Sequence, residues 1–265
     1  MNILITGASR GIGFETAKLL AVQGHAVLAI ARDDKALEHL RTETEKLKHG
    51  AKIHTSVFDL SSGNISAFVE RTAGPLFPRL DVLINNAGSL INKPFEKISR
   101  AELEGIYKVN VFSVFELVQS LLPLFTSGIS ATTTSSSHEV TGERIGERLS
   151  QKQVGAQAQG AHILNISSMG GITGTSKFSG LSAYSSSKGA LSILTECLAL
   201  ELKEKNIAVN ALALGAVQTE MLYKAFPNYK APLSAKQMAE YIADFAVNGQ
   251  KYFNGKVIPV SLSTP

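Results

Sequence analysis

Cysteine is nearly absent from this sequence, and histidine is sparse. The single cysteine, Cys197, excludes an intramolecular disulfide bond and indicates a reducing compartment. Because Cys197 stands in an apolar run with helical spacing, we expect a buried structural thiol rather than a nucleophile. The 6 histidines are scattered along the chain, away from cysteine or carboxylate clusters. Their spacing therefore predicts no metal site.

Clustered charge and long hydrophobic runs are missing as well. The formal net charge of +4 is spread along 265 residues, whereas nucleic-acid-binding proteins usually gather Lys and Arg in one stripe. No apolar run approaches the ~18 residues that a membrane span needs. Residues 2–6 already have the composition of a buried strand, so we expect no leader peptide before them. These absences predict a soluble, cytoplasmic protein that binds neither nucleic acid nor membrane.

Strand-like and helix-like segments alternate along most of the chain. Apolar runs of strand length occupy residues 2–6, 26–31, 52–58, 80–85, 161–167, 207–214 and 256–260. Segments with helical spacing occupy residues 14–24, 33–48, 64–73, 100–125 and 183–205. Because the strands are apolar throughout, they predict a parallel sheet with helices on both faces. The expected fold is an α/β, doubly wound (Rossmann-type) three-layer sandwich, with a mostly parallel seven-stranded sheet in a single domain over residues 1–265.

One segment interrupts this alternation. Residues 126–160 are rich in Ser and Thr and then in Gln and Gly, with little to bury. A connection between a helix and a strand usually needs only ~2–6 residues, so we expect a flexible surface insertion here. Helix-to-strand connections lie at the sheet edge opposite the ligand-binding edge. The insertion should therefore be remote from the chemistry, with a role in assembly left open.

Three glycines follow the first strand, at Gly7, Gly11 and Gly13. Between a strand and a helix, glycines allow a tight turn and a close approach of the backbone to a phosphate, which the helix N-terminus attracts. The spacing G-x-x-x-G-x-G differs from the dinucleotide fingerprint G-x-G-x-x-G and from the P-loop. By itself the turn is compatible with a purely structural role as well as with phosphate binding.

Four further motifs follow the glycine turn: NNAG at residues 85–88, a VN pair at Asn110, NISS at residues 165–168 and YSSSK at residues 184–188. With these motifs in this order, the sequence resembles the short-chain dehydrogenase/reductase family in its single-domain form. The resemblance extends from residue 1 to about residue 260, apart from the insertion. It implies a dinucleotide-binding domain that transfers hydride between a nicotinamide cofactor and a carbonyl or alcohol group.

Tyr184 and Lys188 stand at positions i and i+4, so they project from one face of a helix. An ammonium group beside a phenol favours the phenolate, so we expect Lys188 to lower the pKa of Tyr184. For an isolated Y-x-x-x-K, a surface pair without a catalytic role is the alternative. The resemblance implies that Tyr184 exchanges a proton with the reacting oxygen and that Lys188 also holds the nicotinamide ribose.

Two more polar residues complete the catalytic set that the resemblance implies. Ser168 would hydrogen-bond the reacting oxygen; Ser167 is the competing candidate, but the family usually places its serine second in this pair. Asn110 interrupts an apolar helical run, although asparagine is a poor helix former. By resemblance, Asn110 would kink the helix and hold a water molecule in a proton relay to Lys188. A solvent-facing Asn110 is the alternative.

The residues after the second strand bear on the choice of cofactor. An acidic residue at the end of this strand usually binds the ribose 2′-hydroxyl of NAD, but Ala31 holds that position and Arg32 follows it. Together, Arg10 and Arg32 would favour the 2′-phosphate of NADP(H). Asp33 and Asp34 keep NAD(H) open if the strand ends two residues later.

The resemblance assigns many residues to the cofactor. The residues expected to bind it are Thr6, Gly7, Ser9, Arg10, Gly11, Ile12, Gly13, Arg32, Asp59, Leu60, Asn86, Ala87, Gly88, Tyr184, Lys188, Gly215, Val217 and Thr219. Leu214 replaces the proline that normally precedes Gly215, which should loosen the turn beside the nicotinamide. The segment after Met221, where the family builds its substrate lid, is short and mixed and hints at a modest, partly apolar ligand.

These features predict an NADP(H)-dependent carbonyl reductase that oxidises secondary alcohols in the reverse direction. An acyl-thioester ketone is one candidate substrate among many. The alternative is a non-catalytic NADP(H)-binding redox sensor, although such proteins typically lack the tyrosine or the lysine. The family also implies a homodimer or homotetramer formed through two long helices. The apolar stripe Val111, Phe112, Phe115 and Val118 is compatible with that contact, but core packing is its ordinary explanation.

Overall fold

The computed structural model describes residues 1–127 and 160–262. Within them, one parallel sheet has the strand order β3-β2-β1-β4-β5-β6-β9. Its strands are β1 (Asn2–Thr6), β2 (Ala26–Ala31), β3 (Ile53–Val57), β4 (Val82–Asn85), β5 (Ala161–Ser168), β6 (Ile207–Leu214) and β9 (Val257–Val260). Each coincides with a predicted strand, so the doubly wound α/β sandwich and its seven-stranded sheet are confirmed. A separate small sheet pairs β7 (Val217–Gln218) with β8 (Leu233–Ser234).

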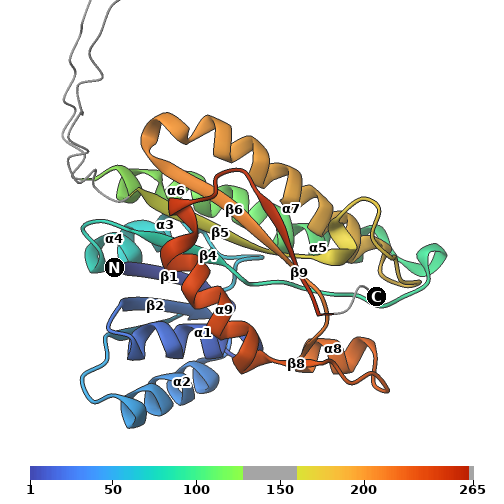
Figure 1. Ribbon diagram of the computed structural model, residues 1–265, viewed down its shortest axis with the longest axis horizontal. Helices are drawn as coiled ribbons and strands as arrows, with labels where there is room; N and C mark the ends of the chain where they lie inside the picture. The colour runs from blue at the N-terminus through green and yellow to red at the C-terminus, as the bar shows by residue number, and fades with distance from the viewer. Residues whose placement is uncertain (128–159, 263–265) are drawn as a thin grey trace, which may run out of the picture.

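Helices cover both faces of the sheet (Figure 1). The α-helices are α1 (Gly11–Val22), α2 (Asp34–Leu47), α3 (Ile65–Phe68), α4 (Gly74–Leu76), α5 (Arg100–Tyr107), α6 (Ser113–Thr126), α7 (Ser182–Glu201), α8 (Glu220–Ala225) and α9 (Ala235–Asn248). Two π-helical segments, η1 (Val69–Ala73) and η3 (Lys108–Phe112), join α3 to α4 and α5 to α6. Short 3₁₀ turns are η2 (Phe95–Lys97), η4 (Met169–Gly171), η5 (Lys203–Lys205) and η6 (Gly249–Lys251). After α1, Gly24 has a positive φ of 99°, the conformation in which a glycine commonly follows the end of a helix.

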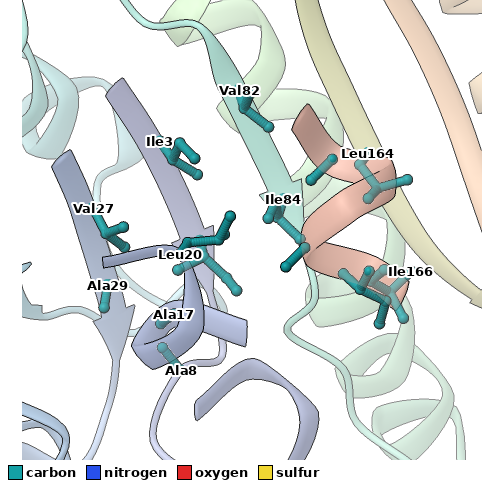
Figure 2. Packing of buried hydrophobic residues seen from close by; sticks show 14 of the residues in the cluster. Ile3, Ala8, Ala17, Leu20, Val27, Ala29, Val82, Ile84, Leu164 and Ile166 are labelled. Carbon is teal, nitrogen blue, oxygen red and sulfur yellow. The ribbon is translucent and has the colours of Figure 1, made fainter. Parts of the chain in front are cut away.

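The strands divide their side chains between two cores. Ile3 and Ile5 of β1 belong to the cluster under α1, α2 and α9, part of which Figure 2 shows. Leu4, between them, belongs to the cluster under α3, α6 and α7. Successive strand residues point to opposite faces, so a strand buried on both sides must be apolar at every position. This is why the strands read as continuous apolar runs rather than as alternating patterns.

The sheet topology determines where a ligand can bind. From β1 the chain moves outward through β2 to β3, then returns to β4 on the other side of β1 and continues through β5 and β6. The connections therefore diverge above the carboxyl ends of β1 and β4 and leave a crevice there. The expected insertion at residues 126–160 lies almost wholly outside the described residues.

One expectation about helices is wrong. Cys197 is exposed rather than buried, because it lies on the outward side of α7 with Ile193 and Leu200. The 27-residue helical stretch Arg100–Thr126 is long and apolar enough to cross a membrane, by length and composition alone. Such a helix is weak evidence for a span, because core helices have the same composition. Here its inner side chains, such as Leu117, are buried in the core.

Candidate active site

A cavity of about 800 Å³ opens at the carboxyl ends of the strands around this crevice, within the usual range for ligand sites. Its wall includes the last residues of β2, β5 and β6, which are Ala31, Ser168 and Leu214. The turns that follow β1 and β4 contribute Gly7 and Asn86. The cavity therefore lies where the topology predicts a ligand site.

The glycine turn forms one side of the cavity and has no room for side chains. Gly7 and Gly11 adopt positive φ angles of 69° and 58°, which side chains disfavour. At Gly13, a Cβ atom would lie 2.3 Å from both the Nδ2 atom of Asn86 and the carbonyl oxygen of Gly7. The spacing of the three glycines is thus explained by backbone conformation at two positions and by close packing at the third.

The beginning of α1 suits an anionic group. Among the described residues, no side chain caps this helix, and its first turn carries no acidic residue. The first backbone N–H groups of a helix lack internal partners and carry a partial positive charge. The turn and the helix start therefore fit the pyrophosphate of a dinucleotide.

A hydrogen-bonded junction holds the glycine turn against the NNAG segment. The Thr6 hydroxyl accepts hydrogen bonds from the N–H groups of Asn86 (3.0 Å) and Ala87 (2.9 Å). The Asn86 side chain donates to the carbonyls of Thr6 (2.9 Å) and Gly7 (3.1 Å). Thr6 is buried and does not line the cavity; its hydroxyl joins the glycine turn to the NNAG segment. Of the predicted site residues, all except Thr6 and Asn110 line the cavity.

Tyr184, Ser168 and Lys188 meet at the other end of the cavity. The first two turns of α7 carry Tyr184 and Lys188, and the Tyr184 phenol lies close enough to the Ser168 side chain, at the end of β5, for that side chain to affect its pKa. The Nζ atom of Lys188 lies 6.0 Å from the centroid of the Tyr184 ring and donates to the Ile166 carbonyl at 2.7 Å. The Ser167 hydroxyl instead donates to the Lys188 carbonyl at 3.0 Å. The geometry thus brings Ser168, and not its competitor, to the phenol.

Burial shifts the pKa values of both groups on α7. Removal from water raises the pKa of Tyr184, and the neighbouring Ser168 side chain offsets part of that rise. Burial lowers the pKa of Lys188 to about 8. The expectation that Lys188 lowers the pKa of Tyr184 is therefore wrong, because desolvation of the phenol is the dominant effect and raises that pKa.

Asn110 is buried in the π-helical segment η3, which interrupts the long helix where a kink was expected. Its Nδ2 group donates to the carbonyl of Ser89 (3.0 Å) and to the hydroxyl of Ser187 (2.8 Å). Its Oδ1 atom accepts from the Ser89 N–H at 2.8 Å, and the Ser187 hydroxyl donates to the Tyr184 carbonyl at 2.7 Å. The solvent-facing alternative is excluded, and Asn110 fastens the loop after NNAG to the helix that carries Tyr184.

The second strand, β2, ends at the residue that the sequence predicts, and this end affects the choice of cofactor. Strand β2 ends at Ala31, and Arg32 follows on the cavity wall. Asp33 caps α2 by accepting a hydrogen bond from the Ala36 N–H at 3.1 Å, and Asp34 lies in the first turn of that helix. Strand β2 therefore does not extend to Asp33 or Asp34, and neither aspartate holds the strand-end position that binds the ribose of NAD.

Leu214, which stands where the family usually has a proline, is part of strand β6. It is the last residue of β6 and pairs with Ser168 on one side and Val260 on the other. The next N–H, of Gly215, donates to the Val260 carbonyl at 2.9 Å. Pairing with the neighbouring strands thus restrains the backbone at Leu214, although this residue lacks the fixed φ of a proline.

Comparison with known proteins agrees with this geometry. The family described as short chain dehydrogenase matches residues 1–143 and 148–230. The chain belongs to the short-chain dehydrogenase/reductase family. It is therefore an NAD(P)-dependent oxidoreductase of the class that acts on CH–OH and C=O groups.

Individual relatives of this short-chain dehydrogenase/reductase include enzymes with different substrates. It is 30% identical to the rhamnolipids biosynthesis 3-oxoacyl-[acyl-carrier-protein] reductase of Pseudomonas aeruginosa, over 97% of this chain and 93% of that one. It is 32% identical to the 7alpha-hydroxysteroid dehydrogenase of Escherichia coli, over 83% of this chain and 72% of that one.

Solved structures of related proteins include complexes with both nicotinamide cofactors. A Pseudomonas aeruginosa protein in an active-site complex with NADP has a TM-score of 0.78 and 28% identity, covering 98% of this chain and 94% of that one. A 3-ketoacyl-(acyl-carrier-protein) reductase from Brucella melitensis in complex with NADH has a TM-score of 0.76 and 26% identity, covering 98% and 96%.

The sequence did not reveal several residues on the wall of this dehydrogenase/reductase cavity. Glu220 forms an ion pair with Arg10, with 3.1 Å between Oε2 and Nη1. Asn92 and the Phe178–Phe226 ring pair join loops that are far apart in the chain. These residues belong to no periodic pattern or motif, and only the mixed, partly aromatic segment after Met221 gave a signal.

Proposed function

We propose that this short-chain dehydrogenase/reductase is an NADP(H)-dependent enzyme that interconverts a ketone or aldehyde with the corresponding alcohol. One observation carries the proposal. The Tyr184 phenol, lying beside Ser168 and Lys188, shares one cavity with the glycine turn that suits a pyrophosphate. An acid, a cation and an anion-binding turn in one cleft are the groups that carbonyl reduction by a dinucleotide requires.

The chain's own residues would hold NADP(H) along the carboxyl edge of the sheet. Backbone groups from Gly11 to Gly13 would bind the pyrophosphate, and Asp59 and Leu60 would lie against the adenine. Arg10 and Arg32 would bind the 2′-phosphate, for which guanidinium groups are well suited. When bound, the nicotinamide supplies hydride to the carbonyl carbon or accepts it from the alcohol carbon.

The catalytic residues would transfer a proton to the carbonyl oxygen and stabilise the charges that result. Because burial raises the pKa of Tyr184, the phenol stays protonated at neutral pH and can donate to the carbonyl oxygen. Ser168 would hydrogen-bond the same oxygen and stabilise the charge that develops on it. Lys188 would hold the ribose and stabilise the phenolate that remains, while Asn110 keeps the loop and α7 in place.

Two measurements on the purified protein test this proposal. Titration with NADPH and with NADH, followed by cofactor fluorescence, should show tighter binding of NADPH. Consumption of NADPH should then accelerate with at least some members of a panel of uncharged ketones and aldehydes. Tight cofactor binding together with no turnover of any ketone, aldehyde or secondary alcohol would contradict the proposal and favour a sensor.

A further inference from the structure

Three loops meet at the end of the cavity beyond Tyr184, and each contacts the other two. We call them the three-loop collar, which comprises residues 89–93, residues 178–181 and the segment 221–226, most of which is the short helix α8. The Nδ2 group of Asn92 donates to the Ala225 carbonyl at 2.7 Å, and the Lys93 N–H donates to the Gly180 carbonyl at 3.0 Å. The collar closes through Phe178 and Phe226, whose rings pack edge to face with centroids 5.7 Å apart.

Asn92 is the residue on which two of these contacts converge. While its Nδ2 group binds the third loop, its Oδ1 atom lies against Gly180 of the second loop. A Cβ atom at Gly180 would lie 2.1 Å from this Oδ1, and Gly180 has a positive φ of 85°. Residues 89–93 and 178–181 can therefore approach each other closely only because residue 180 is a glycine. The Asn92 side chain occupies the space beside Gly180 and reaches from there to α8.

The collar presents an apolar wall to the cavity. The lining side chains of the collar that are apolar are Leu90, Phe178, Leu181, Met221, Leu222, Ala225 and Phe226. Beside the collar, the Glu220 carboxylate pairs with both Arg10 (3.1 Å) and Lys224 (2.5 Å), so each of these cations already has an acidic partner.

A carboxylate or phosphate placed against this wall would lose its hydration. Among the described residues, it would meet no cation that is free of an acidic partner within the collar. An uncharged group would gain from the contact, because it buries apolar surface without giving up solvated charge.

We propose that the three-loop collar binds the body of an uncharged, apolar ketone or aldehyde, and that Asn92 is the positioning residue that holds its wall in place. This inference rests on the proposed function, since Tyr184 must mark the place of the carbonyl group. Asn92 acts through α8 and does not take part in the proton transfer. Its loss should therefore raise KM for a substrate that reaches the collar, and leave kcat for a small ketone and the Kd of NADPH nearly unchanged.

A matched pair of substrates tests whether the collar prefers an uncharged substrate to a charged one. Methyl 4-acetylbenzoate and 4-acetylbenzoate carry the same ketone and ring and differ in one charge. The enzyme should reduce the ester with a kcat/KM at least about tenfold higher than that of the acid. Equal values, or a preference for the acid, would overturn the apolar assignment.

Substitutions at Asn92 test the positioning role. Asn92→Asp cannot donate to the Ala225 carbonyl and repels it, and Asn92→Ala removes the contact without adding charge. Both should raise KM for the ester about fivefold or more, with kcat for butanone and the Kd of NADPH within about twofold. The matched control is Asn228→Asp, which makes the same change at an exposed asparagine three residues after Ala225.

Hydrogen exchange gives a readout that does not need turnover. In the parent, the N–H groups of Phe226 and Tyr229 donate to the Leu222 and Phe226 carbonyls. These amides should exchange several-fold faster in both Asn92 variants and at the parent rate in Asn228→Asp. Unchanged exchange and unchanged KM would overturn the role of Asn92. If the parent binds NADPH but reduces no ketone, the proposed function is wrong. The hydrogen-exchange rates of the variants then still test whether Asn92 holds the collar in place.

Discussion

Lys188 shows how burial changes the chemistry of a single side chain. It is only 4% exposed, and its ammonium group donates to the Ile166 carbonyl. Its spacing from Tyr184 correctly predicted that the two side chains lie together, but it could not predict how much water each loses. Desolvation disfavours the charged form of both groups, so the pKa of the phenol rises while that of the ammonium falls.

Loss of the charge on Lys188 should weaken cofactor binding at alkaline pH. Because its pKa is about 8 in the unliganded protein, the side chain is cationic below that pH and mostly neutral above it. If the cation holds the nicotinamide ribose, the Kd of NADPH should rise about tenfold between pH 7 and pH 9. Fluorescence titration measures this, and Lys188→Met should bind more weakly with a flat profile. A flat profile for the parent would contradict the role of the cation.

Glu220 should oppose the binding of NADPH more than that of NADH. Its carboxylate lies 3.1 Å from Arg10, which is proposed to bind the 2′-phosphate. Glu220→Gln removes the competing negative charge, so the Kd of NADPH should fall by about threefold to tenfold while that of NADH stays the same. Glu204→Gln makes the same charge change in η5 and serves as the control. An equal effect on both cofactors would show that Glu220 does not act through the phosphate.

At the scale of elements, His162 joins β5 to β6 and α9. It is fully buried, its Nδ1 atom lies 2.9 Å from the Ala246 carbonyl, and the Asn210 amide lies 3.1 Å from its Nε2 atom. The neutral imidazole suits both partners, because one nitrogen donates and the other accepts. Burial accordingly lowers the pKa of His162 to about 4.

Acid should therefore destabilise the junction at His162. Between pH 6.5 and pH 4, the unfolded chain binds a proton that the folded protein excludes, so the free energy of unfolding falls as the pH is lowered. Between pH 7 and pH 4.5 the parent should lose about 2 to 3 kcal/mol more than His162→Gln, measured by urea unfolding. Parallel pH profiles for the two proteins would contradict this account.

Regular elements could be predicted from the sequence, whereas the contacts between loops could not. The seven strands of the main sheet and most of the longer helices follow from apolar runs and from three- and four-residue spacing, because burial imposes those patterns. The 14-residue helix α9 was not predicted. Tyr184 and Lys188 were found because a helix turn sets their separation. Asn92 and Ala225 are 133 residues apart and meet only through the tertiary fold. The exposure of Cys197 likewise depends on which side of α7 packs on the sheet.

At the scale of the whole molecule, α6 and α7 leave apolar side chains uncovered on the same face of the sheet. Val118 of the predicted stripe is buried, but Phe112 and Phe115 are about half exposed, and Ile193 of α7 is 60% exposed. The stripe thus divides into a part that packs in the core and a part that faces outward. We propose that the outward part forms the contact of a homodimer or homotetramer.

Charge placed in this contact should dissociate the assembly. Phe115→Glu should reduce the mass measured by light scattering after size-exclusion chromatography, because a buried unpaired carboxylate is costly. Leu47→Glu is the matched control, since Leu47 is 64% exposed on α2 and lies on the opposite face of the sheet. A monomeric parent, or an unchanged mass for Phe115→Glu, would contradict the proposed contact.

The central claim is that the Tyr184 phenol passes its proton to the carbonyl oxygen inside the nucleotide cleft. The most direct test is a single-turnover measurement of NADPH oxidation by a ketone that the parent reduces, comparing Tyr184→Phe with the parent. Tyr252→Phe, a change at an 80% exposed tyrosine, is the control. We predict that Tyr184→Phe binds NADPH as the parent does and oxidises it at least ~100-fold more slowly. A Tyr184→Phe enzyme that oxidised NADPH at the parent rate would contradict the account.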